Sequence, residues 1–128
     1  MNKESVFLVL AALGLFPIAL AYGAVPQFSM PILYGIEVDT INSAHVFRAV
    51  TGLYLAMVIF WLMGAANRTL RQPALWSLVV FMLGLAAGRA LSIVIDGMPS
   101  PVFVVYLGLE IGFGLIGLLL ARALAGRV

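Results

Sequence analysis

Four long apolar stretches dominate the sequence and limit what the chain can fold into. They run from about residue 5 to 24, 44 to 66, 73 to 95 and 101 to 121. A helix of about 20 apolar residues crosses a hydrocarbon core of about 30 Å. Each stretch is long enough for that crossing. The sequence therefore predicts an all-α integral membrane protein, a four-helix bundle that forms one domain over residues 1–128.

The composition excludes several other classes of protein. Of the 128 residues, 64% are hydrophobic and 9% are charged, whereas an ordinary soluble domain has about 25% charged residues. So few charges cannot cover a water-facing surface. A net charge of +2 without a basic stripe argues against nucleic acid as a partner. With no Cys and one His, we expect no metal site and no cofactor within a single chain.

The connecting segments differ in character. Residues 67–72 are polar and predict a short turn, and residues 96–100 predict a tight turn. The segment 25–43 is longer and half apolar, which is typical of a loop lying along a bilayer surface. Its Tyr34, together with Tyr22 just before it, suits the headgroup level.

Local signals mark the expected helix ends. Pro73 and Pro101 are each predicted in a first helical turn, where a missing N–H costs little. Asp39, Thr40 or Ser43 is expected to cap the second span.

The basic residues predict the orientation of the chain. One side of the predicted bundle carries five of them and the other side carries none. An excess of Lys and Arg marks the cytoplasmic side, so both termini are expected there. The five are Lys3, Arg68, Arg71, Arg122 and Arg127.

Three ionisable residues fall inside the predicted spans, where each is costly and suggests a functional site. At 1.5 Å per residue, Arg48 lies about 6 Å deep, Arg89 about 10 Å and Glu110 about 13 Å from the outer side. Arg89 and Glu110 lie at similar distances from the short turn between the last two spans. We therefore predict an Arg89–Glu110 ion pair inside the bundle.

Helical spacing groups further polar residues with these three. If the faces converge, they form an outward-facing polar pocket, in which an excess of positive charge suits an anionic group such as a lipid phosphate. Structural alternatives stay open, since the ion pair can fix helix register without a ligand, and Arg48 can reach the headgroups. The predicted pocket residues are Arg48, Arg89, Glu110, Ser92, Tyr106, His45 and Asp96.

Two Gly-x-x-x-Gly motifs, at residues 84–88 and 108–112, predict close helix packing. Gly114 and Gly117 extend the small-residue surface of the last span. Packing within one bundle is the plain interpretation, and homodimerisation is the alternative.

The stretch from Gly88 to Pro101, GRALSIVIDGMPSP, resembles a family of small bacterial membrane proteins known as domain of unknown function 4345. The Leu33–Gly35 turn, the run from Phe47 to Tyr54 and the run from Leu109 to Gly117 resemble it too. The resemblance implies a multi-pass, four-helix protein of the bacterial inner membrane and carries no activity with it. The family pattern has polar positions that match Arg48, Arg89, Asp96 and Glu110.

Two functions from different classes remain. The first is a non-enzymatic accessory or lipid- or ligand-binding module that uses the polar pocket, with membrane lipids and a homo-oligomer or larger membrane complex as expected partners. The alternative is a small proton-coupled transporter acting as an oligomer, an analogy at the level of fold. An enzyme is less favoured, because the spacing of Ser92, Tyr106, His45 and Glu110 specifies no reaction.

Overall fold

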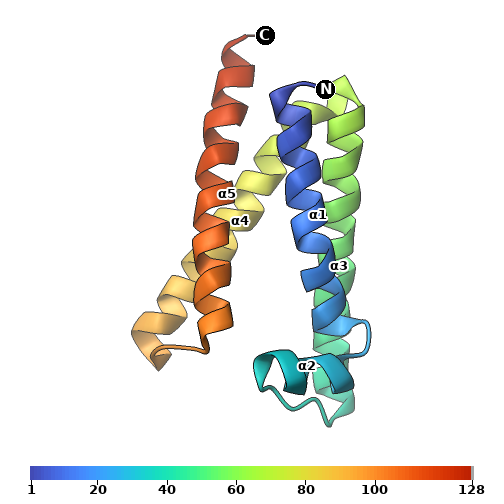
Figure 1. The fold of residues 1–128 in the computed structure, drawn as a ribbon, viewed down its shortest axis with the longest axis vertical. Coiled ribbons are helices and arrows are strands. Elements are labelled where there is room, and N and C mark those ends of the chain that lie inside the picture. The colour runs from blue at the N-terminus through green and yellow to red at the C-terminus, as the bar shows by residue number, and fades with distance from the viewer. Residues whose placement is uncertain (128) are drawn as a thin grey trace.

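The computed structural model describes residues 1–127 and is helical throughout its regular elements. Residues 1–127 form four long helices and one short one, which are labelled in Figure 1. The four long helices are apolar and long enough to cross a membrane, as the sequence predicts. The elements are α1 (Lys3–Gly23), α2 (Pro26–Tyr34), α3 (Ile41–Ala66), α4 (Arg68–Asp96) and α5 (Pro101–Gly126).

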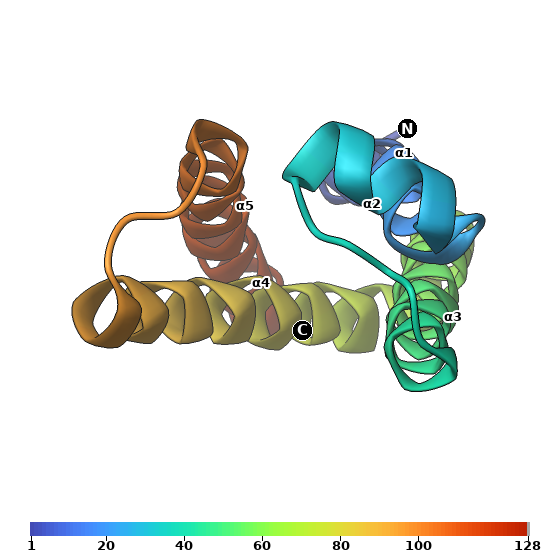
Figure 2. The same cartoon turned by 90° about the horizontal axis from the view of Figure 1, so that it is seen from below.

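Both ends of the chain lie at one end of the bundle together with the α3–α4 turn, and α2 lies at the other end (Figure 1). These two ends are called the terminal end and the α2 end below. α1 packs along α3, and α5 packs along α4. Viewed from the α2 end, α4 runs from the α1–α3 pair across to α5 (Figure 2). α4 is therefore the helix that joins the two halves of the molecule.

Side-chain caps define several helix ends. The Thr40 hydroxyl accepts from the Ser43 N–H at 3.0 Å, and the Ser43 hydroxyl accepts from the Thr40 N–H at 3.3 Å. This reciprocal pair begins α3 and confirms the predicted cap. Pro101 occupies the first turn of α5, also as predicted. α2 ends at Gly35, whose φ of 67° is a conformation that favours glycine.

Two expectations about connecting segments are wrong. The predicted turn 67–72 is mostly helix, because Asn67 caps α4 by accepting from the Thr69 N–H at 2.9 Å. Pro73 consequently lies inside α4 rather than in its first turn. The segment predicted as an interfacial loop contains α2, whose Met30 and Tyr34 are buried against the bundle.

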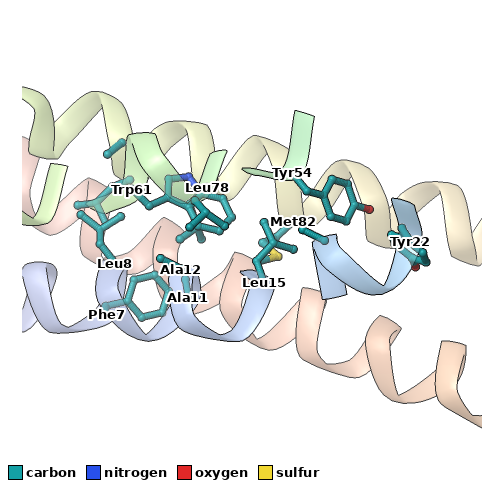
Figure 3. Packing of buried hydrophobic residues seen from close by; sticks show 14 of the residues in the cluster. Phe7, Leu8, Ala11, Ala12, Leu15, Tyr22, Tyr54, Trp61, Leu78 and Met82 are labelled. Carbon is teal, nitrogen blue, oxygen red and sulfur yellow. The ribbon is translucent and has the colours of Figure 1, made fainter. Parts of the chain in front are cut away.

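The apolar core lies between α1, α3 and α4 (Figure 3). Leu8, Trp61 and Leu78 are fully buried there. The indole N–H of Trp61 donates to the Ser77 hydroxyl at 3.1 Å, so the largest core side chain keeps its polar atom satisfied.

Small residues allow two close helix contacts. A Cβ at Gly23 would overlap the Phe47 carbonyl, and a Cβ at Gly64 would overlap Ala74. Thr51 lies beside the first contact and donates to the Ala19 carbonyl at 2.6 Å. The backbones of α1 and α3 therefore approach closely near the α2 end, where the candidate site lies.

Candidate functional site

Arg89 and Glu110 form an ion pair between α4 and α5. The Arg89 Nε lies 2.9 Å from Oε1 and 3.0 Å from Oε2 of Glu110. The side chains of Arg89 and Glu110 are 20% and 9% exposed. The pair predicted from the register of the last two spans is therefore present. It joins the two helices on either side of the short connection at residues 97–100.

A group of aromatic rings encloses the Arg89 guanidinium. Its Nη2 donates to the Tyr22 hydroxyl at 3.3 Å. Its Cζ lies 5.6 Å from the ring centroids of Phe103 and of Tyr106, within the range of a cation–π interaction. Tyr54 packs edge-on against Tyr22 at 5.6 Å. The charge is therefore held by one carboxylate, one phenol and two aromatic faces.

Tyr34 and Tyr106 connect α2 to α5 at this site. Their hydroxyl oxygens lie 2.7 Å apart in a hydrogen bond, and the Tyr34 ring stacks on Phe103 at 5.2 Å. Burial, helped by the hydrogen bond to Tyr106, raises the pKa of the Tyr34 hydroxyl well above its usual value. The Tyr34 phenol therefore stays protonated and serves as a neutral hydrogen-bonding group.

Two cavities border the ion pair. The smaller, about 80 Å³, lies between α1 and α5, and Arg89 and Glu110 both line it. The larger, about 640 Å³, lies along α3 and α4 and is lined mainly by apolar side chains, with Tyr54, Arg89 and Ser92 as the residues that carry polar groups. Arg89 and Tyr54 line both cavities.

The glycine motifs have different roles from the one expected. Gly84 and Gly88 line the larger cavity, and a Cβ at either position would meet open space. Gly108 and Gly112 also face open space. Their predicted packing within the bundle is therefore wrong. Close packing does occur at Gly114 and Gly117, which lie against side chains of α4, so the part of the predicted small-residue surface formed by these two glycines is confirmed.

Arg48 and His45 do not join the predicted pocket, so this expectation is also wrong. Arg48 is exposed and its Nη1 donates to the carbonyls of Gly23 and Ala24, at 3.4 and 3.1 Å. It thereby caps the C-terminus of α1, a favourable position for a cation. His45 is exposed and lines a separate surface hollow with Arg48 and Asp39. The shared face of α3 meets α1 rather than the ion pair.

Ser92 and Asp96 remain near the outer end of α4. The Ser92 hydroxyl donates to Asp96 Oδ2 at 2.8 Å, a contact between residues one helical turn apart. Ser92 lines the larger cavity, and Asp96 is exposed. Only Ser92 of these two therefore borders the same space as Arg89.

Sequence reasoning missed three of the tyrosines at the site. Tyr22, Tyr34 and Tyr54 are 8%, 5% and 6% exposed, so all three are buried inside the bundle. The available signal was the buried arginine itself, since a guanidinium carries about five N–H donors and one carboxylate cannot satisfy them all. Tyrosines that contact neighbouring spans are the natural partners for the remainder.

The polar groups of the site are a guanidinium, a carboxylate and several hydroxyls. Among residues 1–127, no group of three or more His, Asp or Glu side chains could hold a metal ion. The larger cavity offers apolar walls, a guanidinium and a hydroxyl. A pocket of this kind suits a molecule with an apolar body and one polar group.

The fold and site define a small multi-pass membrane protein with four apolar helices and a buried ion pair. The chain belongs to the family described as "Domain of unknown function (DUF4345)", whose sequence model matches residues 4–121. Neither a search of curated proteins nor a search of solved structures found a match.

Proposed function

We propose that this protein is a non-enzymatic module of a bacterial inner membrane that binds a lipid or lipid-like molecule beside Arg89. The larger cavity carries the proposal, because a partly buried guanidinium lines its mainly apolar wall. The lining of this cavity indicates the class of ligand. A suitable molecule has a long apolar body and a hydrogen-bond acceptor, such as an ester or keto oxygen, that faces Arg89.

The ion pair between Arg89 and Glu110 favours a ligand whose hydrogen-bond acceptor is uncharged. Its charge is already matched by Glu110, so an additional anion would leave negative charge in excess at the site. Nε and Nη2 have protein partners, whereas Nη1 has no hydrogen-bond partner among residues 1–127. The Nη1 hydrogens are therefore the donors available to a ligand.

The glycines of α4 support the same proposal. Because Gly84 and Gly88 have no side chains, they leave room along the cavity wall for an acyl or prenyl chain. Because a Cβ at Gly88 meets open space, a leucine at this position would extend into the space beside the cavity wall. The matched control is Gly112, which faces open space on α5 and lines neither cavity.

Native mass spectrometry of the detergent-purified protein tests the proposal. Wild type and Gly112→Leu are expected to retain a co-purifying lipid, and Gly88→Leu is expected to lose at least about tenfold in occupancy. Equal retention by the two variants, or no retained lipid in wild type, would contradict it.

The transporter alternative makes a different prediction. It requires Glu110 to exchange protons during transport, although both of its oxygens contact Arg89. Substrate-driven proton flux in proteoliposomes that Glu110→Gln abolishes would favour a transporter over a binding module.

A further inference from the structure

A second polar site lies at the terminal end, remote from the Arg89 site. There a cavity of about 630 Å³ is formed by the starts of α1 and α4 and the end of α5. Three arginines and one carboxylate line it, which gives a net charge of +2 (three minus one). The polar residues that line it are Asn2, Glu4, Arg68, Arg71, Gln72 and Arg127.

Hydrogen bonds to the protein hold most of these side chains in place. Arg71 donates from Nε to the Gly64 carbonyl at 3.2 Å and from Nη2 to the Ala65 carbonyl at 2.9 Å. Arg127 forms an ion pair with Glu4, a residue that is only 2% exposed. The walls of the cavity are therefore organised without a ligand.

Arg68 is the exception among the three arginines. The structure gives its side chain no hydrogen bond and no ion pair with residues 1–127. It sits at the first residue of α4, and the first turn of that helix contains no acidic residue. A helix N-terminus carries partial positive charge, so a cation there is unfavourable unless an anion is close.

The two helix starts add to the positive potential of this cavity. α1 begins after Asn2 and α4 begins after Asn67, and Asn2 and Arg68 both line the cavity. Backbone N–H groups at helix starts and arginine side chains both commonly bind phosphate in proteins. The single carboxylate, Glu4, is already neutralised by Arg127.

We propose that this cavity binds a phosphate group, with Arg68 and Arg71 as its main charged contacts. The cavity lies at the ends of apolar helices, where lipid headgroups are found. The phosphate can come from an anionic phospholipid or from a free anion, and the experiment below separates these sources.

The test compares Arg68→Gln with Arg122→Gln. Both arginines are exposed and each substitution removes one positive charge, but Arg122 does not line the cavity. The Arg68 side chain is exposed and makes no hydrogen bond or ion pair with residues 1–127, so its substitution is expected to leave the fold intact, which circular dichroism checks. Binding is measured by native mass spectrometry with phosphatidylglycerol and phosphatidylcholine, and by thermal shift with inorganic phosphate against chloride at equal ionic strength.

A lipid phosphate is supported if the wild-type protein binds phosphatidylglycerol in preference to phosphatidylcholine. This binding should fall at least about tenfold in Arg68→Gln and less than about twofold in Arg122→Gln. Stabilisation by inorganic phosphate with the same dependence on Arg68 supports a free anion. Equal effects of the two substitutions, or no preference for phosphatidylglycerol and no effect of phosphate, would overturn the proposal. Because Gly88 lies outside this cavity, failure of the Arg89 proposal leaves this result unchanged.

Discussion

The hydroxyl groups of Tyr34 and Tyr106 share a hydrogen bond of 2.7 Å although the two residues are 72 positions apart in the chain. This bond connects the short helix α2 to α5. It lies next to the Arg89–Glu110 pair, because the Tyr106 ring also faces the Arg89 guanidinium. The two halves of the molecule are therefore joined by directional contacts at the α2 end.

Replacing Tyr34 by Phe is expected to cost about 1 kcal/mol of unfolding free energy, since it removes one hydrogen bond and keeps the ring. Tyr106→Phe should cost a similar amount. The double variant should cost little more than either single variant, because the same bond is lost in all three. Reversible unfolding in mixed micelles measures these values, and fully additive losses would show that the two hydroxyls do not act as a pair.

The stability of the protein should fall at high pH partly through Tyr34. Burial raises the pKa of its hydroxyl in the folded state, so folding disfavours the tyrosinate form. Tyr34 therefore contributes its full share to the free energy of unfolding below the unfolded-state pKa of about 10. This contribution is lost as the pH rises above that value, because the unfolded chain then releases the phenolic proton more readily than the folded one. The unfolding free energy of wild type should therefore decline more steeply above pH about 10 than that of Tyr34→Phe. Parallel pH profiles for the two proteins would show that Tyr34 makes no such contribution.

Removing only one charge of the Arg89–Glu110 ion pair should lower the free energy of unfolding more than removing both charges. Arg89→Met leaves Glu110 buried without its partner, and the expected loss is about 3–5 kcal/mol of unfolding free energy. In the double variant Arg89→Met/Glu110→Leu both charges are absent, so much of that loss should be recovered. Arg122→Met, an exposed residue outside the site, is the control and should change stability little. A double variant as unstable as Arg89→Met would show that the cost comes from lost packing rather than unpaired charge.

Replacing two glycines of α3 by alanine, one at a time, should have different effects on the stability of the protein. A Cβ at Gly64 would overlap Ala74, so Gly64→Ala should destabilise by about 1–3 kcal/mol. A Cβ at Gly52 meets open space, so Gly52→Ala should be neutral or stabilise by up to about 1 kcal/mol through helix propensity. Thermal unfolding of the two variants checks this difference. A similar loss in both would mean that the close contact of α3 with α4 at Gly64 is absent.

The absence of cysteine makes the predicted orientation directly testable. Met98→Cys, in the exposed α4–α5 turn, should react with a membrane-impermeant maleimide added to intact cells. Ala125→Cys, near the end of α5, should react only after the membrane is permeabilised. The reverse pattern would place the termini outside, against the distribution of basic residues.

The features that could be predicted from the sequence depend on neighbours along the chain. The lengths of the apolar stretches predicted the four long helices. The Arg89–Glu110 pair could be predicted because a short turn fixes the register of α4 against α5. Thr40 with Ser43 is a local capping pattern, and it too was confirmed.

The remaining features depend on which helix faces meet, and spacing within one helix does not specify that. Arg48 and Thr51 do share a face of α3, but the face packs on α1, where they donate to the carbonyls of Ala24 and Ala19. Tyr34 reaches the site only because α2 folds back beneath the long helices. Helical spacing could not predict the contact between α2 and α5, because the two helices are far apart in the chain.

Arg89 lines both cavities beside the ion pair, and this position has a thermodynamic consequence. A molecule that accepts a hydrogen bond from the guanidinium on the α3 side alters the donors that remain for a molecule on the α1 side. If both spaces were occupied, linkage would make this influence mutual, so that filling one would change the affinity of the other. Arg89 is the charged side chain through which such coupling would pass.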